Sequence, residues 1–288
     1  MTDPLPIDLL LIAASAWLAI GLLGLVAPRN TRFISKTLFP LGALVGIGVG
    51  AVALDALGGP AQTAVLAIGL PDLPFHLRLD NLSAVFALLL GFASAGISVY
   101  AAGYFRQGEG TAPGVLCLEY HFFLASMLMV LLADDAYAFM VAWECMALSS
   151  FFLVTTDHRH EEVRRAGYLY LLIAHVGAIA ILLCFGVMTG GIGGGGGDYS
   201  FAGMRGQELS PFWASAAFLL ALAGFGAKAG LVPLHVWLPE AHPAAPSPVS
   251  AMMSGVMLKT AIYGLLRVSF DLLHTCLLYT SCTRLSCR

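Results

Sequence analysis

Four ionisable side chains lie near the middle of separate apolar stretches of this sequence: Glu144, His175, Lys228 and Lys259. A charged side chain at the centre of a bilayer costs ~2.5–3.5 kcal/mol on insertion scales, so such residues must face inward, form pairs or contact water. One intramembrane lysine is compatible with a structural ion pair, and Glu144 could form one with Lys228. Four consecutive stretches with one titratable group each, at similar depth, favour a proton relay, because such groups can accept and release protons.

The stretch that contains Lys228 has an unusual form. From Pro211 to Pro239 it is too long for one straight span of about 20 residues, and Gly230 and Pro233 follow the lysine closely. A helix interrupted by glycine and proline at mid-membrane is typical of a discontinuous, ion-binding helix. The alternative is an ordinary span followed by an interfacial segment.

Three polar residues flank this interruption: His235, Glu240 and His242. They could line a path by which protons enter, or they could pack at the membrane interface. The sequence leaves both interpretations open.

Other polar residues have simpler interpretations. Glu119 and His121 lie near the start of the fourth apolar stretch, where a side chain can reach the interface by snorkelling. Tyr168 lies seven residues before His175, so the two share one helix face. The histidines and glutamates of 158–162 occur in a basic loop, so we expect a solvated run and no metal site.

The composition defines the class of protein. Hydrophobic residues make up 59% of the 288 residues and charged residues only 11%, against roughly 45–50% and 25% in soluble chains. A soluble domain, a disordered chain, a coiled coil and a nucleic-acid binder all need more charge than this. The apolar stretches do not alternate in polarity, as the strands of a membrane barrel would. We therefore expect an all-α, polytopic membrane helix bundle.

The expected transmembrane helices number about eight, because about 20 apolar residues cross the hydrocarbon core. Their approximate ranges are 8–27, 37–57, 80–102, 115–133, 136–155, 165–189, 211–239 and 248–272. Seven lysines and arginines lie in odd-numbered connecting loops and two in even-numbered ones, which places the N-terminus outside. We expect a multi-pass protein of the inner (cytoplasmic) membrane.

Two further patterns predict local structure. Residues 75–80 alternate in polarity, which indicates a short strand on the outer surface. Gly42, Gly46 and Gly50 repeat at a spacing of four residues, which favours close helix packing within the chain over dimerisation.

Two segments resemble a known family. AWECMALSS at 142–150 resembles the fifth helix of the antiporter-like subunits of respiratory complex I, and GFGAKAGLVPLHVWLPEAHPAAPSPVSAMMSGVMLKT at 224–260 resembles their seventh and eighth helices. The same family includes the Mrp cation/proton antiporters and the membrane subunits of energy-converting hydrogenases. Over about 80–273 the chain is most similar to the hydrogenase-4 component B, or formate-hydrogenlyase, type.

The resemblance implies the first of two inverted five-helix repeats, with a discontinuous seventh helix. Residues 1–114 would form three N-terminal transmembrane helices, and 115–273 the five-helix half-channel. The family would continue beyond 273, so the chain resembles an N-terminal fragment. We expect the polar, cysteine-rich segment 274–288 to be a non-native tail that makes no contact with the helical core.

The resemblance also implies roles for single residues. Glu144 matches the family's fifth-helix glutamate, Lys228 the lysine at the helix break, and Lys259 the basic residue of the eighth helix. His175 lies in the part of the chain that resembles the hydrogenase-type members, and the resemblance defines its role less well than those of the other three residues. These subunits carry no flavin, iron–sulfur or nickel centre, so no cofactor and no catalytic residue is expected.

The predicted function is proton translocation along the buried Glu/Lys/His row. The chain would be a non-redox subunit of a hydrogenase or NADH/quinone oxidoreductase complex, driven by redox partner subunits, with other membrane subunits and the lipid bilayer as partners and no nucleic acid. An Mrp-type Na⁺/H⁺ antiporter subunit and a structural membrane anchor are the alternatives. The sequence does not distinguish a proton from a sodium ion as the coupling ion.

Overall fold

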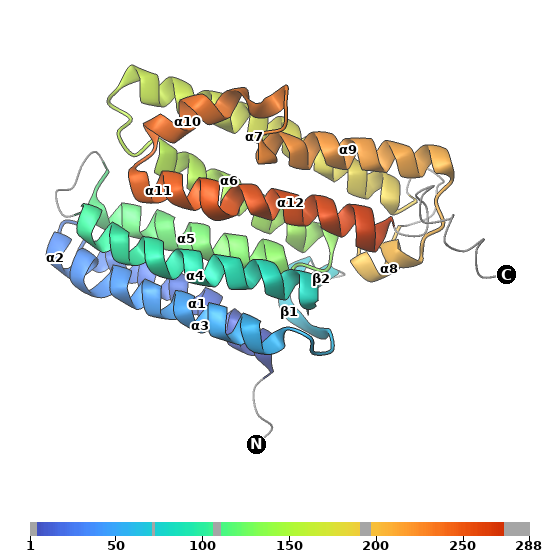
Figure 1. Ribbon diagram of the computed structural model, residues 1–288, viewed down its shortest axis with the longest axis horizontal. Coiled ribbons are helices and arrows are strands. Elements are labelled where there is room, and N and C mark those ends of the chain that lie inside the picture. The colour runs from blue at the N-terminus through green and yellow to red at the C-terminus, as the bar shows by residue number, and fades with distance from the viewer. Residues whose placement is uncertain (1–4, 71–72, 106–110, 191–196, 274–288) are drawn as a thin grey trace.

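The protein is a bundle of long helices (Figure 1), described by a computed structural model over residues 5–70, 73–105, 111–190 and 197–273. Eight helical segments in this part of the chain are long and apolar enough to cross a membrane, which confirms the expected number. They are Pro6–Val26, Thr31–Ala56, Asn81–Tyr104, Pro113–Leu132, Ala136–Val154, Glu161–Met188, Pro211–Ala244 and Ser247–Leu272. The predicted segment 274–288 lies outside the described residues.

The first five spans consist of simple helices with one exception. They are α1 (Pro6–Val26), α3 (Phe39–Ala56), α4 (Asn81–Tyr104), α5 (Pro113–Leu132) and α6 (Ala136–Val154), and α2 (Thr31–Phe33) and the π-helical η1 (Ile34–Leu38) lead into α3. Local sequence sets their starts. Asp80 and Asp135 precede α4 and α6, and their carboxylates accept hydrogen bonds from the backbone of Ser83 and Ala138, which satisfies N–H groups of the first turn.

The last three spans are more irregular. They consist of α7 (Glu161–Met188), then α9 (Pro211–Ala229) with η4 (Leu234–Trp237) and α10 (Leu238–Ala244), then α11 (Ser247–Met252), η5 (Met253–Met257), α12 (Leu258–Leu266) and η6 (Arg267–Leu272). The short α8 (Phe201–Gly206) lies before α9.

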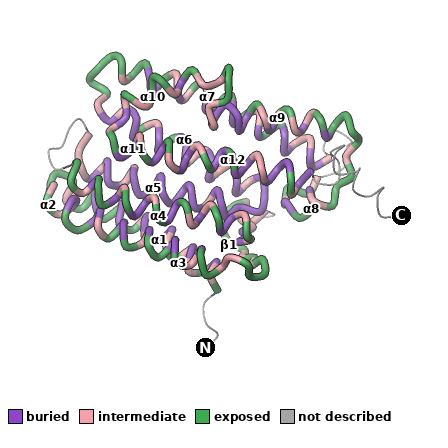
Figure 2. Tube along the Cα trace, in the orientation of Figure 1, coloured by how far each residue is buried: buried purple, intermediate pink, exposed green. Residues whose placement is uncertain are grey.

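Burial divides the bundle into a centre and a periphery. Helix α5 is the most enclosed span. In its most apolar stretch 72% of the residues are buried, against 33% in that of α1. Figure 2 shows the outward faces of α1, α3, α7 and α9 exposed. Exposed residues on these faces include many large apolar ones, such as Leu44, Val176 and Leu219, as expected where a helix meets lipid.

Helices α3 and α4 pack closely through glycine. A Cβ on Gly46 would lie 2.9 Å from the backbone of Gly91, and a Cβ on Gly91 would lie 2.7 Å from the Cα of Gly50. Gly42 faces the ring of His121 on α5 instead. The glycines therefore serve packing within the chain, as the sequence analysis favoured.

A β-hairpin connects α3 to α4. Strand β2 (Leu73–Leu79) confirms the predicted strand, and it pairs in antiparallel fashion with β1 (Gln62–Leu70), which the sequence analysis did not identify. Gln62 anchors β1 to the start of α1, because its side chain accepts a hydrogen bond from the backbone N–H of Ile7 at 3.0 Å. We call this end of the bundle the hairpin end and the opposite end, where α5 begins, the basic end.

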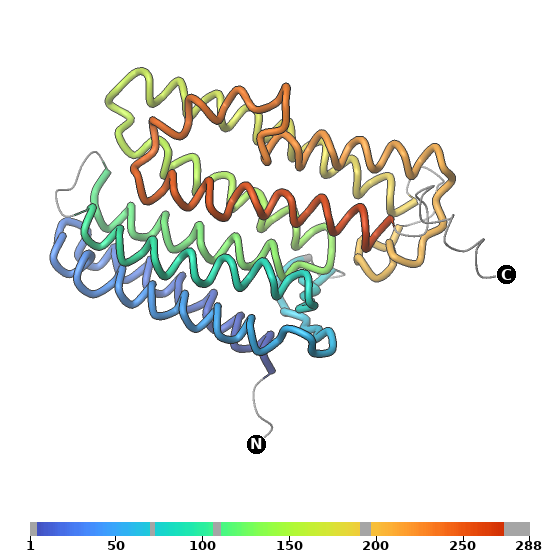
Figure 3. Tube along the Cα trace, viewed as in Figure 1, coloured from blue at the N-terminus to red at the C-terminus, as the bar shows by residue number. Residues whose placement is uncertain are grey.

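The seventh span is interrupted, as the glycines and prolines predicted. Helix α9 ends at Ala229, and Gly230 adopts φ +78°, a left-handed conformation that favours glycine. Pro233 follows and has no N–H with which to continue a helix. Trp237 of η4 then donates an indole hydrogen bond to Ala227 O at 2.8 Å, which holds the connection against the end of α9. Figure 3 traces this change of direction between α9 and α10.

Candidate proton-transfer site

Lys228 is the most enclosed cation of the central bundle. It lies in the last turn of α9, at the interruption of the seventh span, and is only 2% exposed. The partial negative charge of a helix C-terminus favours a cation at this position. Its Nζ donates a hydrogen bond to the Tyr170 hydroxyl at 2.5 Å, and the Trp237 ring packs on Tyr170 with centroids 5.0 Å apart.

The hydrogen-bond chain continues from Lys228 to a third helix. The Tyr170 hydroxyl of α7 is hydrogen-bonded to the Ser150 hydroxyl of α6. Ser150 also lies within hydrogen-bond distance of Met146 O at 2.7 Å and Ala147 O at 2.8 Å. A hydroxyl both donates and accepts, so Tyr170 and Ser150 can carry a proton to or from the lysine.

Sequence reasoning did not identify this chain of hydroxyls. The spacing to His175 pointed to Tyr168, which is 68% exposed, whereas Tyr170 is 1% exposed. Tyrosines two residues apart point to different sides of a helix, and only the packing of α9 shows which one meets Lys228. The single available signal was Ser150 within the family-like segment 142–150.

Glu144 pairs with His175 and not with Lys228. His175 Nε2 lies 3.5 Å from Glu144 Oε2, and no carboxylate of the described residues lies within 4.0 Å of Lys228. The interpretation of Glu144 and Lys228 as one buried salt bridge is therefore wrong in this conformation. The reason is that the neighbouring helices α6 and α7 present Glu144 and His175 at one level, while Tyr170 occupies the position next to the lysine.

His175 has a polar partner at each ring nitrogen. His175 Nδ1 lies 2.9 Å from Leu171 O, and since a carbonyl only accepts, Nδ1 carries a hydrogen. The Nε2 lone pair would then face a carboxylate unless one proton resides on Nε2 or on Glu144. The His175 side chain is 52% exposed and that of Glu144 is 39% exposed, so both reach the outer face of the chain.

The two polar contacts form successive rungs between α6 and α7. Glu144 of α6 contacts His175 of α7. Ser150, six residues after Glu144 on α6, contacts Tyr170, which lies five residues before His175 on α7. With 1.5 Å of rise per residue, the rungs are separated by about 8–9 Å along the helices. Any shift of α6 against α7 therefore changes both contacts together.

Lys259 is not part of this cluster. Its Nζ donates to Ser254 O at 2.5 Å, and its side chain is exposed on the eighth span. The eighth span instead approaches the relay through Met257, whose Sδ lies 3.8 Å from the Tyr170 hydroxyl. Lys259 and Lys228 thus lie on neighbouring spans without a direct contact among the described side chains.

The three residues after the break do not form one cluster either. His242 Nδ1 lies 2.8 Å from the Ser250 hydroxyl, and Glu240 is exposed. His235 Nδ1 is enclosed and has no hydrogen-bond partner in the described part of the chain. The path by which protons enter remains a prediction for these residues.

The fourth span also differs from expectation. His121 is fully buried, and its Nδ1 donates to Cys117 O at 2.8 Å. It cannot snorkel, because it points between α5 and α3, into the space that Gly42 leaves without a side chain. Glu119 lies in an apolar pocket, described below.

A second ionic cluster, at the hairpin end, was not anticipated. Arg267 binds both oxygens of Asp80 at 2.6 and 2.8 Å and also contacts Asp271. Arg205 binds both oxygens of Asp271 at 3.0 and 2.9 Å and also contacts Asp134. Burial disfavours the charged form of Asp80, but the hydrogen bonds and charge of Arg267 outweigh it and lower the pKa of Asp80 to about 2.

The spans, the interrupted helix and the buried lysine define a multi-pass membrane protein of the antiporter-like class. The chain belongs to the NADH:quinone oxidoreductase/Mrp antiporter transmembrane family, which matches residues 133–283. The match extends ten residues beyond 273, where we expected the resemblance to end.

Named relatives include subunits of membrane complexes. The chain is 46% identical over 197 residues to hydrogenase-4 component B of Escherichia coli, which covers 68% of this chain and 29% of the relative. It is 27% identical over 235 residues to formate hydrogenlyase subunit 3 of the same organism, covering 79% and 36%. The chain thus spans about a third of the length of these relatives.

Solved structures show the same arrangement of helices. A chain of the membrane-bound sulfane sulfur reductase, an archaeal respiratory membrane complex, aligns with a TM-score of 0.73 at 25% identity, over 89% of this chain and 40% of that one. A chain of the Mrp complex from Dietzia sp. DQ12-45-1b aligns with a TM-score of 0.73 at 25% identity, over 94% and 49%.

Proposed function

We propose that the chain is the first-repeat portion of a proton-translocating membrane subunit in a hydrogenase-type or NADH/quinone oxidoreductase complex. The observation that carries this proposal is the enclosed Lys228, whose ammonium contacts a chain of two hydroxyls from α7 and α6 and no carboxylate of the described residues within 4.0 Å. A structural charge in a membrane interior is expected to be paired. A charge with hydroxyl partners alone is suited to lose and regain its proton.

The proposed transfer uses the two rungs between α6 and α7. While the Glu144–His175 pair is distant from Lys228, the low-polarity side chains around the lysine disfavour its charged form. Its proton then passes through Tyr170 and Ser150, each hydroxyl accepting one proton and releasing its own, to water or another acceptor beyond Ser150. When α6 and α7 bring a carboxylate closer, the charged lysine is favoured and regains a proton. Redox chemistry in partner subunits would drive this movement, and the chain itself would need no cofactor.

The exposed polar groups support a proposal for where partner subunits bind. Glu144, His175 and Lys259 reach the outside of the described bundle, and bare contact of such groups with lipid is unfavourable. We infer that a neighbouring membrane subunit covers the Glu144–His175 pair and that a second, inverted repeat covers Lys259. The excess of lysine and arginine in odd-numbered loops supports an N-terminus on the outer side.

A second candidate is a subunit of an Mrp-type Na⁺/H⁺ antiporter, without a redox partner. It is favoured by the likeness to the Mrp complex and by 30% identity over 197 residues to a putative antiporter subunit of Staphylococcus aureus. The relay residues would serve either function, since both require a lysine that exchanges protons.

The test measures proton translocation by the full-length protein in its own membrane complex, in sealed vesicles with a pH-sensitive dye. Glu144→Gln is nearly isosteric but exchanges no proton, so translocation should be lost while the complex remains assembled. Glu162→Gln, at an exposed position of α7, is the matched control and should translocate normally. Equal translocation by both variants would contradict the proposal. A sodium gradient that drives proton movement without a redox substrate would favour the antiporter.

A further inference from the structure

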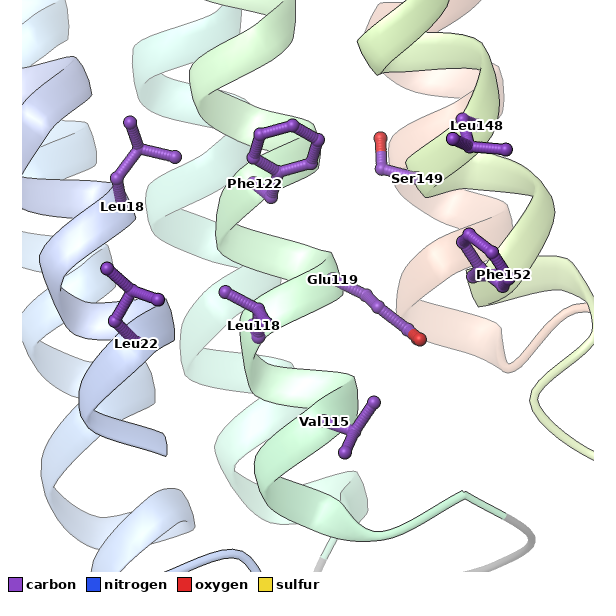
Figure 4. Close-up of a pocket in the computed structure, with 9 residues that line it drawn as sticks. All are labelled: Leu18, Leu22, Val115, Leu118, Glu119, Phe122, Leu148, Ser149 and Phe152. Carbon is purple, nitrogen blue, oxygen red and sulfur yellow. The ribbon is translucent and has the colours of Figure 1, made fainter. Parts of the chain in front are cut away.

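An apolar pocket opens on the side of the bundle between α1, α5 and α6, near the basic end (Figure 4). Its volume is about 540 Å³, within the range of roughly 300–1,000 Å³ that is typical of small-molecule sites. Most of its wall is aliphatic or aromatic. Residues of this wall include Leu22 of α1, Val115, Glu119 and Phe122 of α5, and Leu148 and Phe152 of α6.

Glu119 is the one ionisable residue in this wall. Its Oε2 is enclosed and has no hydrogen-bond partner in the described part of the chain. No lysine, arginine or histidine of that part lies within 4.0 Å of its carboxylate. Figure 4 shows the carboxyl group projecting from α5 toward α6, near Phe152. A carboxylate in apolar surroundings requires a donor, which must come from outside this part of the chain.

The depth of Glu119 matches the boundary between headgroups and acyl chains. It follows Pro113, the first residue of α5, by six positions, or about 9 Å. A helical side chain leans toward the helix N-terminus, so the carboxylate lies closer to the membrane surface than its Cα. The interfacial region adds about 5–8 Å on each side of the hydrocarbon core.

The loop that packs on the start of α5 carries a cation. Pro28 O accepts a hydrogen bond from Gly114 N at 2.9 Å, which holds the loop after α1 against the start of α5. Arg29, the next residue, is exposed. A carboxylate in the pocket and a guanidinium on the adjoining loop carry the two charges that complement a zwitterionic headgroup with an ammonium and a phosphate.

We propose that this pocket binds a phospholipid with a primary-amine headgroup, of the phosphatidylethanolamine class. One acyl chain fills the apolar pocket, the ammonium donates to Glu119, and the phosphate meets Arg29. A choline headgroup has no N–H to donate, and a glycerol headgroup has no cation, so both satisfy the carboxylate less well. This site does not depend on the proposed proton transfer.

The test is lipid retention by the full-length protein, measured by native mass spectrometry after equilibration with equal amounts of ethanolamine, choline and glycerol phospholipids with identical acyl chains. Wild type should retain the ethanolamine lipid several-fold over the other two. Glu119→Gln should reduce this preference to near equality, and Glu162→Gln, at the same end but outside the pocket, should retain it. Equal retention of the three lipids by wild type, or an unchanged preference in Glu119→Gln, would overturn the proposal.

A second variant separates the acyl chain from the headgroup. Val115→Phe fills the pocket and should lower the retention of all three lipids by a similar factor, without changing their ratio if any remains. A photoreactive residue at Leu148 should form adducts with lipid. If it instead labels a partner protein in the membrane complex, a protein helix occupies the pocket and the lipid proposal is wrong.

Discussion

The hairpin end and the middle of the bundle use charge in opposite ways. At the hairpin end, each of two arginines binds both oxygens of one aspartate: Arg205 binds Asp271 and Arg267 binds Asp80. With Asp134, three aspartates surround the two guanidiniums. In the middle, Lys228 contacts a single hydroxyl, and the Glu144–His175 contact is a single one at 3.5 Å. Bidentate pairs with an arginine that keeps its proton suit a fixed structure, whereas a lysine with a hydroxyl partner suits a changing protonation state.

Removing a guanidinium from the hairpin end should have the largest effect on stability. Arg267→Met should cost about 3–5 kcal/mol of stability, because the partly buried Asp80 would lose its bidentate partner and keep only Arg78 at 3.6 Å, while Asp271 would keep Arg205 alone. The protein should lose its folded monodisperse form in detergent, as measured by fluorescence-detected size exclusion during a thermal ramp. Arg267→Lys keeps the charge and should recover part of the loss. Unchanged thermal stability in Arg267→Met would show that the cluster is not structural.

Acid should weaken the hairpin end before any effect on the apolar core. The pKa of Asp80 is lowered from 3.8 to about 2, so its stabilising contribution is fully present above about pH 4. It is lost as the pH falls toward 2, because the unfolded chain then binds a proton that the folded one does not. The contribution is about 2 kcal/mol. Asp80→Asn keeps a helix-capping side chain and should remove this pH dependence, whereas Asp55→Asn on the exposed face of α3 should not. Identical acid profiles for wild type and Asp80→Asn would contradict the assignment.

A smaller effect is expected from removing one hydroxyl in the middle region. Tyr170→Phe removes the hydroxyl between Lys228 and Ser150 but keeps the ring that packs on Trp237. Translocation should fall about tenfold or more, since the relay loses a group that passes protons. Assembly should be retained. Tyr168→Phe on the exposed side of α7 is the control. A Tyr170→Phe protein that translocates at the rate of this control would remove Tyr170 from the relay.

Local features of the chain were predictable from the sequence, but the contacts between residues distant in the sequence were not. The eight spans and the break after Lys228 follow from apolar length and from Gly230 and Pro233, whose effects are confined to neighbouring residues. The strand β1, however, is recognisable only through its partner β2. A segment without a clear alternation of polar and apolar residues becomes a strand because it pairs with a neighbouring strand.

The pairing of charges shows the same limit. The opposite charges of Glu144 and Lys228 suggested that they form a pair. The rotation of α6 and α7 instead places Glu144 next to His175 and Tyr170 next to Lys228. The contact of Arg267 with Asp80 joins residues 187 positions apart. No local pattern indicates such a contact, because it depends on how the eighth span packs against the third span, α4.

Replacing Lys228 by arginine in the full-length protein tests directly whether this lysine carries protons. Arginine keeps the positive charge at the end of α9 but scarcely releases its proton. We expect Lys228→Arg to assemble with its partners and to fail to translocate protons in sealed vesicles, while Lys36→Arg, outside the relay, translocates normally. Normal translocation by Lys228→Arg would show that the lysine is a fixed charge and not a proton carrier.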